Sequence, residues 1–134
     1  FGLTRDTGKN HLIKATLESL AYQSKDVLDA MQKDSGIKLQ KLQVDGGACA
    51  NDYLMQFQAD VLGVRIERPE MIESTAIGAA YLAGYGSGLW SIDEINQKRK
   101  INQVFEVQRS GQWRAYKSKR WNEAVKRTLN WIEP

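Results

Sequence analysis

The sequence has little cysteine, little histidine and no long run of apolar residues. One Cys among 134 residues excludes an internal disulfide and favours a reducing compartment, which predicts a cytoplasmic protein. One His beside that single Cys leaves too few soft ligands for a zinc site of the Cys/His type, and we expect no metal site in this chain. The opening Phe-Gly-Leu has neither the charged segment nor the apolar segment of a secretory signal, so no signal peptide is expected.

A membrane-spanning helix is also disfavoured, although residues 74–92 carry no charged side chain. A spanning helix needs about 20 predominantly apolar residues. This run contains serines and a threonine, and it is interrupted by Gly78, Gly84, Gly86 and Gly88. The pattern predicts a buried helix that is followed by a turn.

The remaining composition, 42% hydrophobic and 26% charged, is that of one globular domain, but its charge is unevenly distributed. Residues 1–95 hold 9 basic and 13 acidic side chains, whereas residues 96–134 hold 10 basic and 3 acidic ones. The basic tail also carries the aromatic residues Trp113, Tyr116, Trp121 and Trp131. Such a tail could bind nucleic acid, but we favour an amphipathic helix that packs its tryptophans on the acidic body.

Hydrophobic periodicity predicts an α/β chain in which helices alternate with two short strands. Helices are expected over 9–34, 51–62, the residues after 74 or 75, 91–97 and 112–132; strands are expected over 39–44 and 64–68; and residues 98–108 are expected to be extended. Predicted helix caps are Asp6 or Thr7, Gly36, Asn51, Gly63, Ser74 or Thr75, and Ser91. Two parallel strands are too few for a stable sheet, so further strands are expected upstream of Phe1 or in a partner chain.

The sharpest candidate site is the segment 44–51, Val-Asp-Gly-Gly-Ala-Cys-Ala-Asn, which joins the first strand to the second helix. Ligands of open α/β sheets bind at this end of the strands, and glycines allow the backbone to approach a phosphate or a sugar. Gly46 and Gly47 could equally make only a tight turn. Asn51 could likewise be a helix cap, a nucleotide ligand or both, and Cys49 is either a reactive thiol or, as we favour, a small packed one.

Several of these segments together resemble the C-terminal part of the FGGY family of carbohydrate kinases. The resemblance covers nearly the whole chain and is carried by residues 1–5 with 11–18, 26–31, 34–37, 44–48 with Asn51, 54–60 and 75–84. The opening 1–5 and the run 55–60, Met-Gln-Phe-Gln-Ala-Asp, favour the glycerol-phosphorylating members over the sugar-specific members. Another polyol or sugar kinase of the family is the alternative, and a non-enzymatic interaction module with a nucleic-acid-binding tail is the rival class.

The resemblance implies an actin-like, ribonuclease-H-like ATPase fold and transfer of the γ-phosphoryl group of Mg-ATP to a terminal hydroxyl of glycerol. It places Gly47 and Asn51 at the adenosine end of ATP or ADP, with Gly46 and Ala48 as supporting backbone. It implies that the catalytic Asp, the glycerol-binding residues and the main Mg²⁺ contacts lie upstream of Phe1, so no catalytic residue is expected in this chain. Residues 1–95 are then an incomplete nucleotide-binding domain, residues 96–134 are a helical tail packed on it, and the complete enzyme is expected to be a homo-oligomer.

Overall fold

The secondary structure alternates between helices and strands, in an order close to the expected one. A computed structural model describes residues 1–98 and 100–130 of the chain. Its elements are α1 (Lys9–Ser35), β1 (Lys41–Gln43), the 3₁₀ turn η1 (Gly47–Ala50), α2 (Asp52–Leu62), β2 (Arg65–Pro69), α3 (Ser74–Gly86), α4 (Ile92–Lys98), β3 (Ile101–Phe105) and α5 (Gly111–Thr128). The predicted α/β class is confirmed.

The sheet has three strands in the order β1-β2-β3, one more than expected. β1 and β2 are parallel, with Leu42 opposite Ile66, as a strand–helix–strand unit requires. β3 runs antiparallel to β2, with Phe105 opposite Ile66. The extended conformation of this segment was expected, but its role as a strand was missed because its only buried residue is Phe105. The segment expected as a helical tail therefore also completes the sheet.

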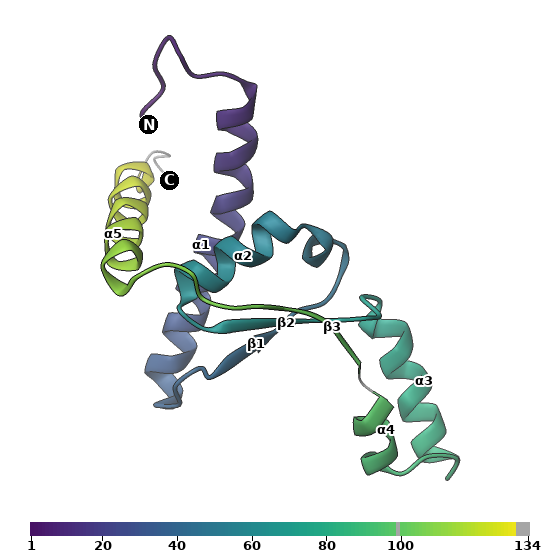
Figure 1. The fold of residues 1–134 in the computed structure, drawn as a ribbon. Helices are drawn as coiled ribbons and strands as arrows, with labels where there is room; N and C mark the ends of the chain where they lie inside the picture. Colours follow the sequence, from purple (N-terminus) through teal and green to yellow (C-terminus); the bar gives the residue numbers. More distant parts are fainter. Residues whose placement is uncertain (99, 131–134) are drawn as a thin grey trace.

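Helix α2 lies between the sheet and the two helices α1 and α5 (Figure 1). Its apolar residues make up half of the buried core, which α1, η1, β2 and β3 complete. The core residues are Ala21, Tyr22, Cys49, Leu54, Met55, Phe57, Ala59, Val61, Ile66 and Phe105. Because both faces of α2 are buried, the helix packs on the sheet on one side and on α1 and α5 on the other.

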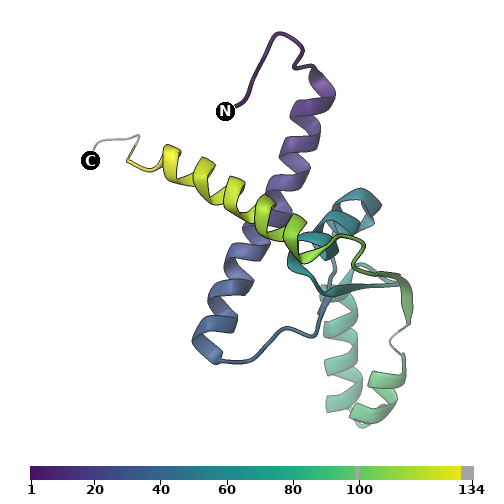
Figure 2. The same cartoon turned by 60° about the vertical axis from the view of Figure 1, so that its left-hand side comes forward.

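Aromatic side chains attach α5 to α1 and α2, as expected for the tryptophans of the tail. The Trp121 ring stacks on Tyr22 at 5.0 Å, and Trp113 meets Phe57 edge to face at 5.9 Å. The indole N–H of Trp121 also donates to Asp26 over 2.7 Å. Figure 2 shows α5 crossing α1. Tyr116 is exposed, and Trp131 lies outside the described residues.

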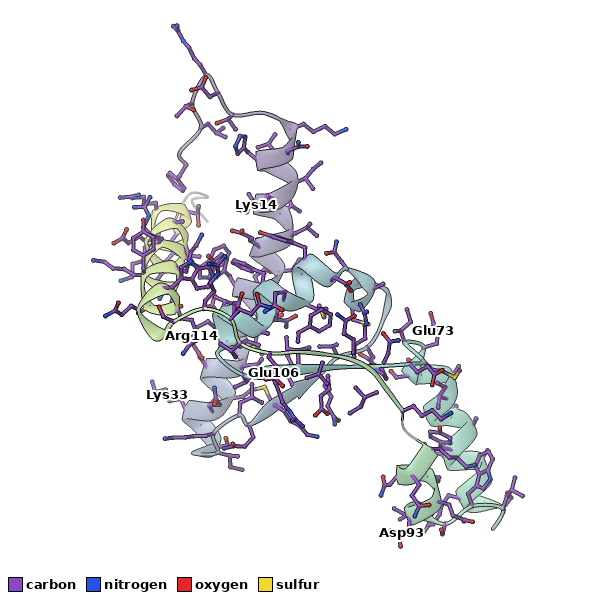
Figure 3. The ribbon with its side chains drawn as sticks, in the orientation of Figure 1. Lys14, Lys33, Glu73, Asp93, Glu106 and Arg114 are labelled. Atoms are coloured by element: carbon purple, nitrogen blue, oxygen red, sulfur yellow. The ribbon has the colours of Figure 1, made fainter. Side chains whose placement is uncertain are left out.

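Helices α3 and α4 project away from the sheet and the other helices (Figure 1). Figure 3 places Glu73 and Asp93 on this projecting part, far from Lys14 and Arg114 on the opposite side. The prediction of a buried helix here is wrong for the described chain. Gly84 is the only buried residue of α3, because within the described residues the Trp90 ring covers this position and little else packs on the helix. Among the described residues, no helix combines the length and apolarity needed to cross a membrane.

The helix ends follow the predicted capping residues at most positions. Gly36 and Gly63 end α1 and α2 in the left-handed conformation, with φ of 70° and 75°. The Ser91 hydroxyl accepts from the Glu94 N–H before α4. Two predictions are wrong. The N-cap of α1 is Gly8 instead of Asp6 or Thr7, because the Thr7 hydroxyl accepts from Thr4, and α3 already includes Ser74 and Thr75, with Glu73 before it.

Candidate functional site

The loop 44–51 leaves β1 at its carboxyl end and enters α2 through the turn η1. Gly46 has φ of 78° and ψ of 170°, a backbone conformation that is essentially restricted to glycine. Its N–H donates to the Ile72 carbonyl over 2.8 Å, which ties the loop to the segment before α3. A second tie joins the same parts, because the Ser74 hydroxyl donates to the Asp45 carboxylate. Gly46 is therefore required for the shape of the loop itself.

Gly47 and Ala48 form the exposed start of the turn. Gly47 has an ordinary φ, so its conformation alone does not demand glycine. Among the described residues, no heavy atom beyond Gly47 and its chain neighbours lies within 4 Å of the position that a Cβ on Gly47 would occupy, and both residues are exposed. The space that a side chain would fill is thus open to a ligand that approaches the backbone closely.

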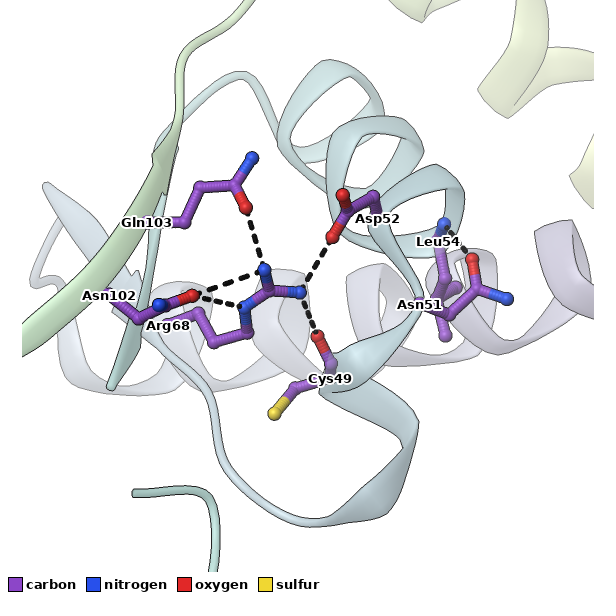
Figure 4. Close-up of polar contacts among 7 residues, drawn as sticks. All are labelled: Cys49, Asn51, Asp52, Leu54, Arg68, Asn102 and Gln103. Atoms are coloured by element: carbon purple, nitrogen blue, oxygen red, sulfur yellow. Dashed lines mark hydrogen bonds and ion pairs between the residues drawn. The ribbon is translucent and has the colours of Figure 1, made fainter. Parts of the chain in front are cut away.

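Asn51 has two polar side-chain atoms, of which only Oδ1 forms a hydrogen bond with a described residue. Its Oδ1 accepts from the Leu54 N–H over 3.0 Å, which makes Asn51 the N-cap of α2. The side chain is exposed, and Figure 4 shows the amide nitrogen pointing away from this bond. The capping interpretation is confirmed, and it leaves the amide N–H groups available to a ligand.

Arg68 of β2 lies outside the loop but binds it, and the sequence prediction missed this contact. Its Nη1 donates to the Cys49 carbonyl over 3.0 Å and to Asp52 Oδ1 over 2.7 Å (Figure 4). On the other side, Nη2 donates to Gln103 Oε1 over 2.6 Å, and Asn102 Oδ1 is 3.3 Å away. A signal was present in the alternation of β2, since Arg68 falls on the same face as the buried Ile66.

Cys49 is a packed residue, as we favoured. Its side chain is only 1% exposed. Burial raises the pKa of the Cys49 thiol above its usual value, and the Arg68 guanidinium opposes this effect in part. Since the thiolate is the reactive form, this thiol is poorly suited to nucleophilic chemistry.

Two clefts border the start of the loop, and Val44 and Asp45 line both. One, of about 720 Å³, lies between the end of the sheet and helices α3 and α4, where Ser74 and Tyr81 also line it. The other, of about 640 Å³, lies beside α1 and is also lined by Ala48. Within residues 1–98 and 100–130, no group of three or more His, Cys, Asp or Glu side chains could hold a metal ion. The chain thus presents a shaped loop between two clefts, without a metal centre in its described part.

Comparisons with known proteins point to one family. The model of the C-terminal domain of the FGGY family of carbohydrate kinases matches residues 1–87. Glycerol kinases from Enterobacter sp. (strain 638) and Klebsiella pneumoniae (strain 342) are each 56% identical to the chain over 134 residues, which is 99% of this chain and 27% of each relative. The chain therefore spans about a quarter of the length of the curated relatives it matches.

Solved structures agree with this result. A crystal structure of Plasmodium falciparum glycerol kinase with ADP superposes with a TM-score of 0.87 at 36% identity, covering 98% of this chain and 27% of that one. A ligand-bound xylulose kinase from Lactobacillus acidophilus, at 22% identity, shares the fold with a TM-score of 0.74, covering 96% of this chain and 26% of that one. The chain belongs to the FGGY family of carbohydrate kinases and corresponds to the C-terminal part of these enzymes.

Proposed function

We propose that this chain is the nucleotide-binding C-terminal part of a glycerol kinase, which transfers the γ-phosphoryl group of ATP to glycerol and forms glycerol 3-phosphate. The observation that carries the proposal is the loop 46–51 at the carboxyl end of β1, where Gly47, Ala48 and Asn51 are exposed, in a chain that is 56% identical to glycerol kinases. The nucleotide fits the loop in chemical terms, because open space lies above Gly47 and the Asn51 amide is free to donate.

Within this proposal, each loop residue has a separate task. Gly47 and Ala48 allow the nucleotide to lie against the backbone, and Gly46 holds the turn in its shape. Asn51 donates from its amide nitrogen to the adenosine end of ATP or ADP while its oxygen caps α2. Phosphoryl transfer depends mainly on positioning and on charge stabilisation, so a loop that only orients the nucleotide contributes to the rate.

The reacting groups are assigned to the rest of the kinase. We propose that the catalytic Asp, the glycerol-binding residues and the ligands of Mg²⁺ lie outside this chain, which spans 27% of the length of the glycerol kinases it matches. When bound, Mg²⁺ would neutralise charge on the transferred phosphoryl group. Self-association of the complete enzyme and a cytoplasmic location stay predictions. The nucleic-acid alternative is disfavoured because Trp113 and Trp121 of the tail pack on the core.

Substitution of Asn51 in the complete kinase tests the proposal, with glycerol and ADP titrated separately. Asn51→Ser retains a capping oxygen but removes the amide donor, so we expect weaker ADP binding with glycerol binding and stability nearly unchanged. Asn51→Ala removes both functions, and it should lose stability by about 0.5–2 kcal/mol in addition. Unchanged ADP affinity of Asn51→Ser would refute the assignment. The isolated chain of 134 residues is expected to bind no glycerol and to have no kinase activity.

A further inference from the structure

We propose that Arg68 is a positioning residue for nucleotide binding, which sets the orientation of Asn51 and of the turn before it. The inference rests on the proposed function of the loop 46–51. Arg68 itself lies on β2, outside the loop, and acts on the ligand only through loop residues.

The contacts of Arg68 bracket Asn51 along the chain. The Nη1 group binds the Cys49 carbonyl, two residues before Asn51, and the Asp52 carboxylate, the residue after it. A single planar group thus contacts the chain on both sides of Asn51, through a backbone carbonyl before it and a side-chain carboxylate after it (Figure 4). Because the guanidinium is rigid and planar, it transmits a fixed geometry that the flexible ammonium of a lysine would not.

The environment of Arg68 makes these bonds strong. Its side chain is only 12% exposed, so water competes weakly for the guanidinium. Hydrogen bonds from a charged donor are roughly twice as strong as neutral ones. The Asp52 side chain is 65% exposed, so solvent screens that ion pair, and the bond to the Cys49 carbonyl is the more important contact.

The far side of Arg68 is anchored on β3. Gln103 Oε1 accepts from Nη2 over 2.6 Å, and the guanidinium lies 5.3 Å from the centre of the buried Phe105 ring. Gln103 lies beyond the residues 1–87 that the family model matches. The loop is therefore connected through Arg68 to a strand outside the part of the chain that matches the family domain.

Arg65 on the same strand offers a matched control. It also pairs with an acidic residue, since its guanidinium contacts Glu67, but on the opposite face of the sheet and away from the loop. Loss of either arginine removes one charge and one ion pair from β2. Only loss of Arg68 should change the loop.

The test measures ADP dissociation constants, the KM for glycerol and urea unfolding for Arg68→Met and Arg65→Met in the complete kinase. We expect Arg68→Met to weaken ADP binding about tenfold and to leave the KM for glycerol within about twofold. Arg65→Met should leave ADP binding within about twofold. Equal effects of the two substitutions on ADP affinity, or no effect of Arg68→Met, would overturn the inference.

A double-substitution experiment separates positioning from general stability. If Arg68 acts through Asn51, the loss caused by Arg68→Met should shrink in an Asn51→Ser background, whereas additive losses would contradict the inference. Should Arg68→Met fail to fold, Gln103→Leu supplies the same comparison, because it removes the anchor and leaves the arginine in place. If Asn51→Ser itself leaves ADP affinity unchanged, the proposed function fails; if only the arginine substitution has no effect, the positioning role alone fails.

Discussion

Substitution of Gly46 by alanine should destabilise the protein through backbone conformation alone. The residue has φ of 78° and ψ of 170°, where a residue with a side chain is strained by about 1–3 kcal/mol. In the part of the chain that the structure describes, no heavy atom beyond Gly46 and its chain neighbours lies within 4 Å of the added Cβ, so steric collision contributes nothing. Alanine also restricts the unfolded chain, which returns about 0.4–1 kcal/mol where the native conformation suits it and less here. The expected net loss is about 1–2 kcal/mol.

Gly47→Ala is the matched control. Gly47 is the neighbour of Gly46 and has the same open surroundings, but its φ is ordinary. Urea unfolding of the kinase, followed by tryptophan fluorescence, should show a lower midpoint for Gly46→Ala and a change within about 0.5 kcal/mol for Gly47→Ala. The proposed function adds that Gly47→Ala should still weaken ADP binding, because the new methyl group fills the space above the turn. The reasoning is refuted if Gly46→Ala is as stable as the parent, or if both substitutions cost the same.

Three further predictions concern other parts of the fold. Asp60→Ala leaves the N–H groups of Gln108 and Arg109 without their acceptor and should cost about 2–4 kcal/mol in urea unfolding. Hydrogen bonds from Lys41 and Gln43 lower the pKa of Glu67 from its usual 4.5 to about 2. The ionised carboxylate therefore contributes fully to the free energy of unfolding above pH 4.5, and this contribution is lost as the pH falls through 2. Urea unfolding of Glu67→Gln should show a smaller change of stability with pH in that window. The buried Cys49 thiol should react with iodoacetamide on the order of a hundredfold more slowly in the folded than in the urea-unfolded chain, as mass spectrometry would measure, and equal rates would contradict its packing.

Local signals predicted much of the fold because they act over a few residues. The periodicity of α1 and α2, the left-handed glycines Gly36 and Gly63, and the Asn51 cap were all confirmed. β3 was missed as a strand because it lies at the sheet edge and has two polar residues, Asn102 and Gln103, in succession. Its apolar and polar residues therefore do not alternate clearly. The apolar composition of α3 predicted a buried helix, but Gly84 is its only buried residue. Composition alone does not show whether another part of the described chain packs against a helix.

The site was predictable only in its loop. Gly46 and Gly47 are visible in the sequence as a glycine pair after a strand, although only the structure separates the glycine that needs its positive φ from the one that does not. Arg68 was missed because a charged residue in a short strand usually faces water. Its partners Cys49 and Gln103 are far away in the sequence, and pairing over such distances has no local pattern.

The positions of the Arg68 partners in the sequence also bear on when the loop folds during synthesis. Cys49 and Asp52 precede Arg68 in the chain, while Gln103 follows it by 35 residues. During synthesis, β1, α2 and β2 can therefore pair before the strand that anchors the guanidinium exists. Contacts between distant residues form late because the intervening chain must first lose its entropy. The loop 46–51 should consequently acquire its final geometry only when β3 joins the sheet, so that nascent chains ending before Gln103 would carry the loop without its anchor.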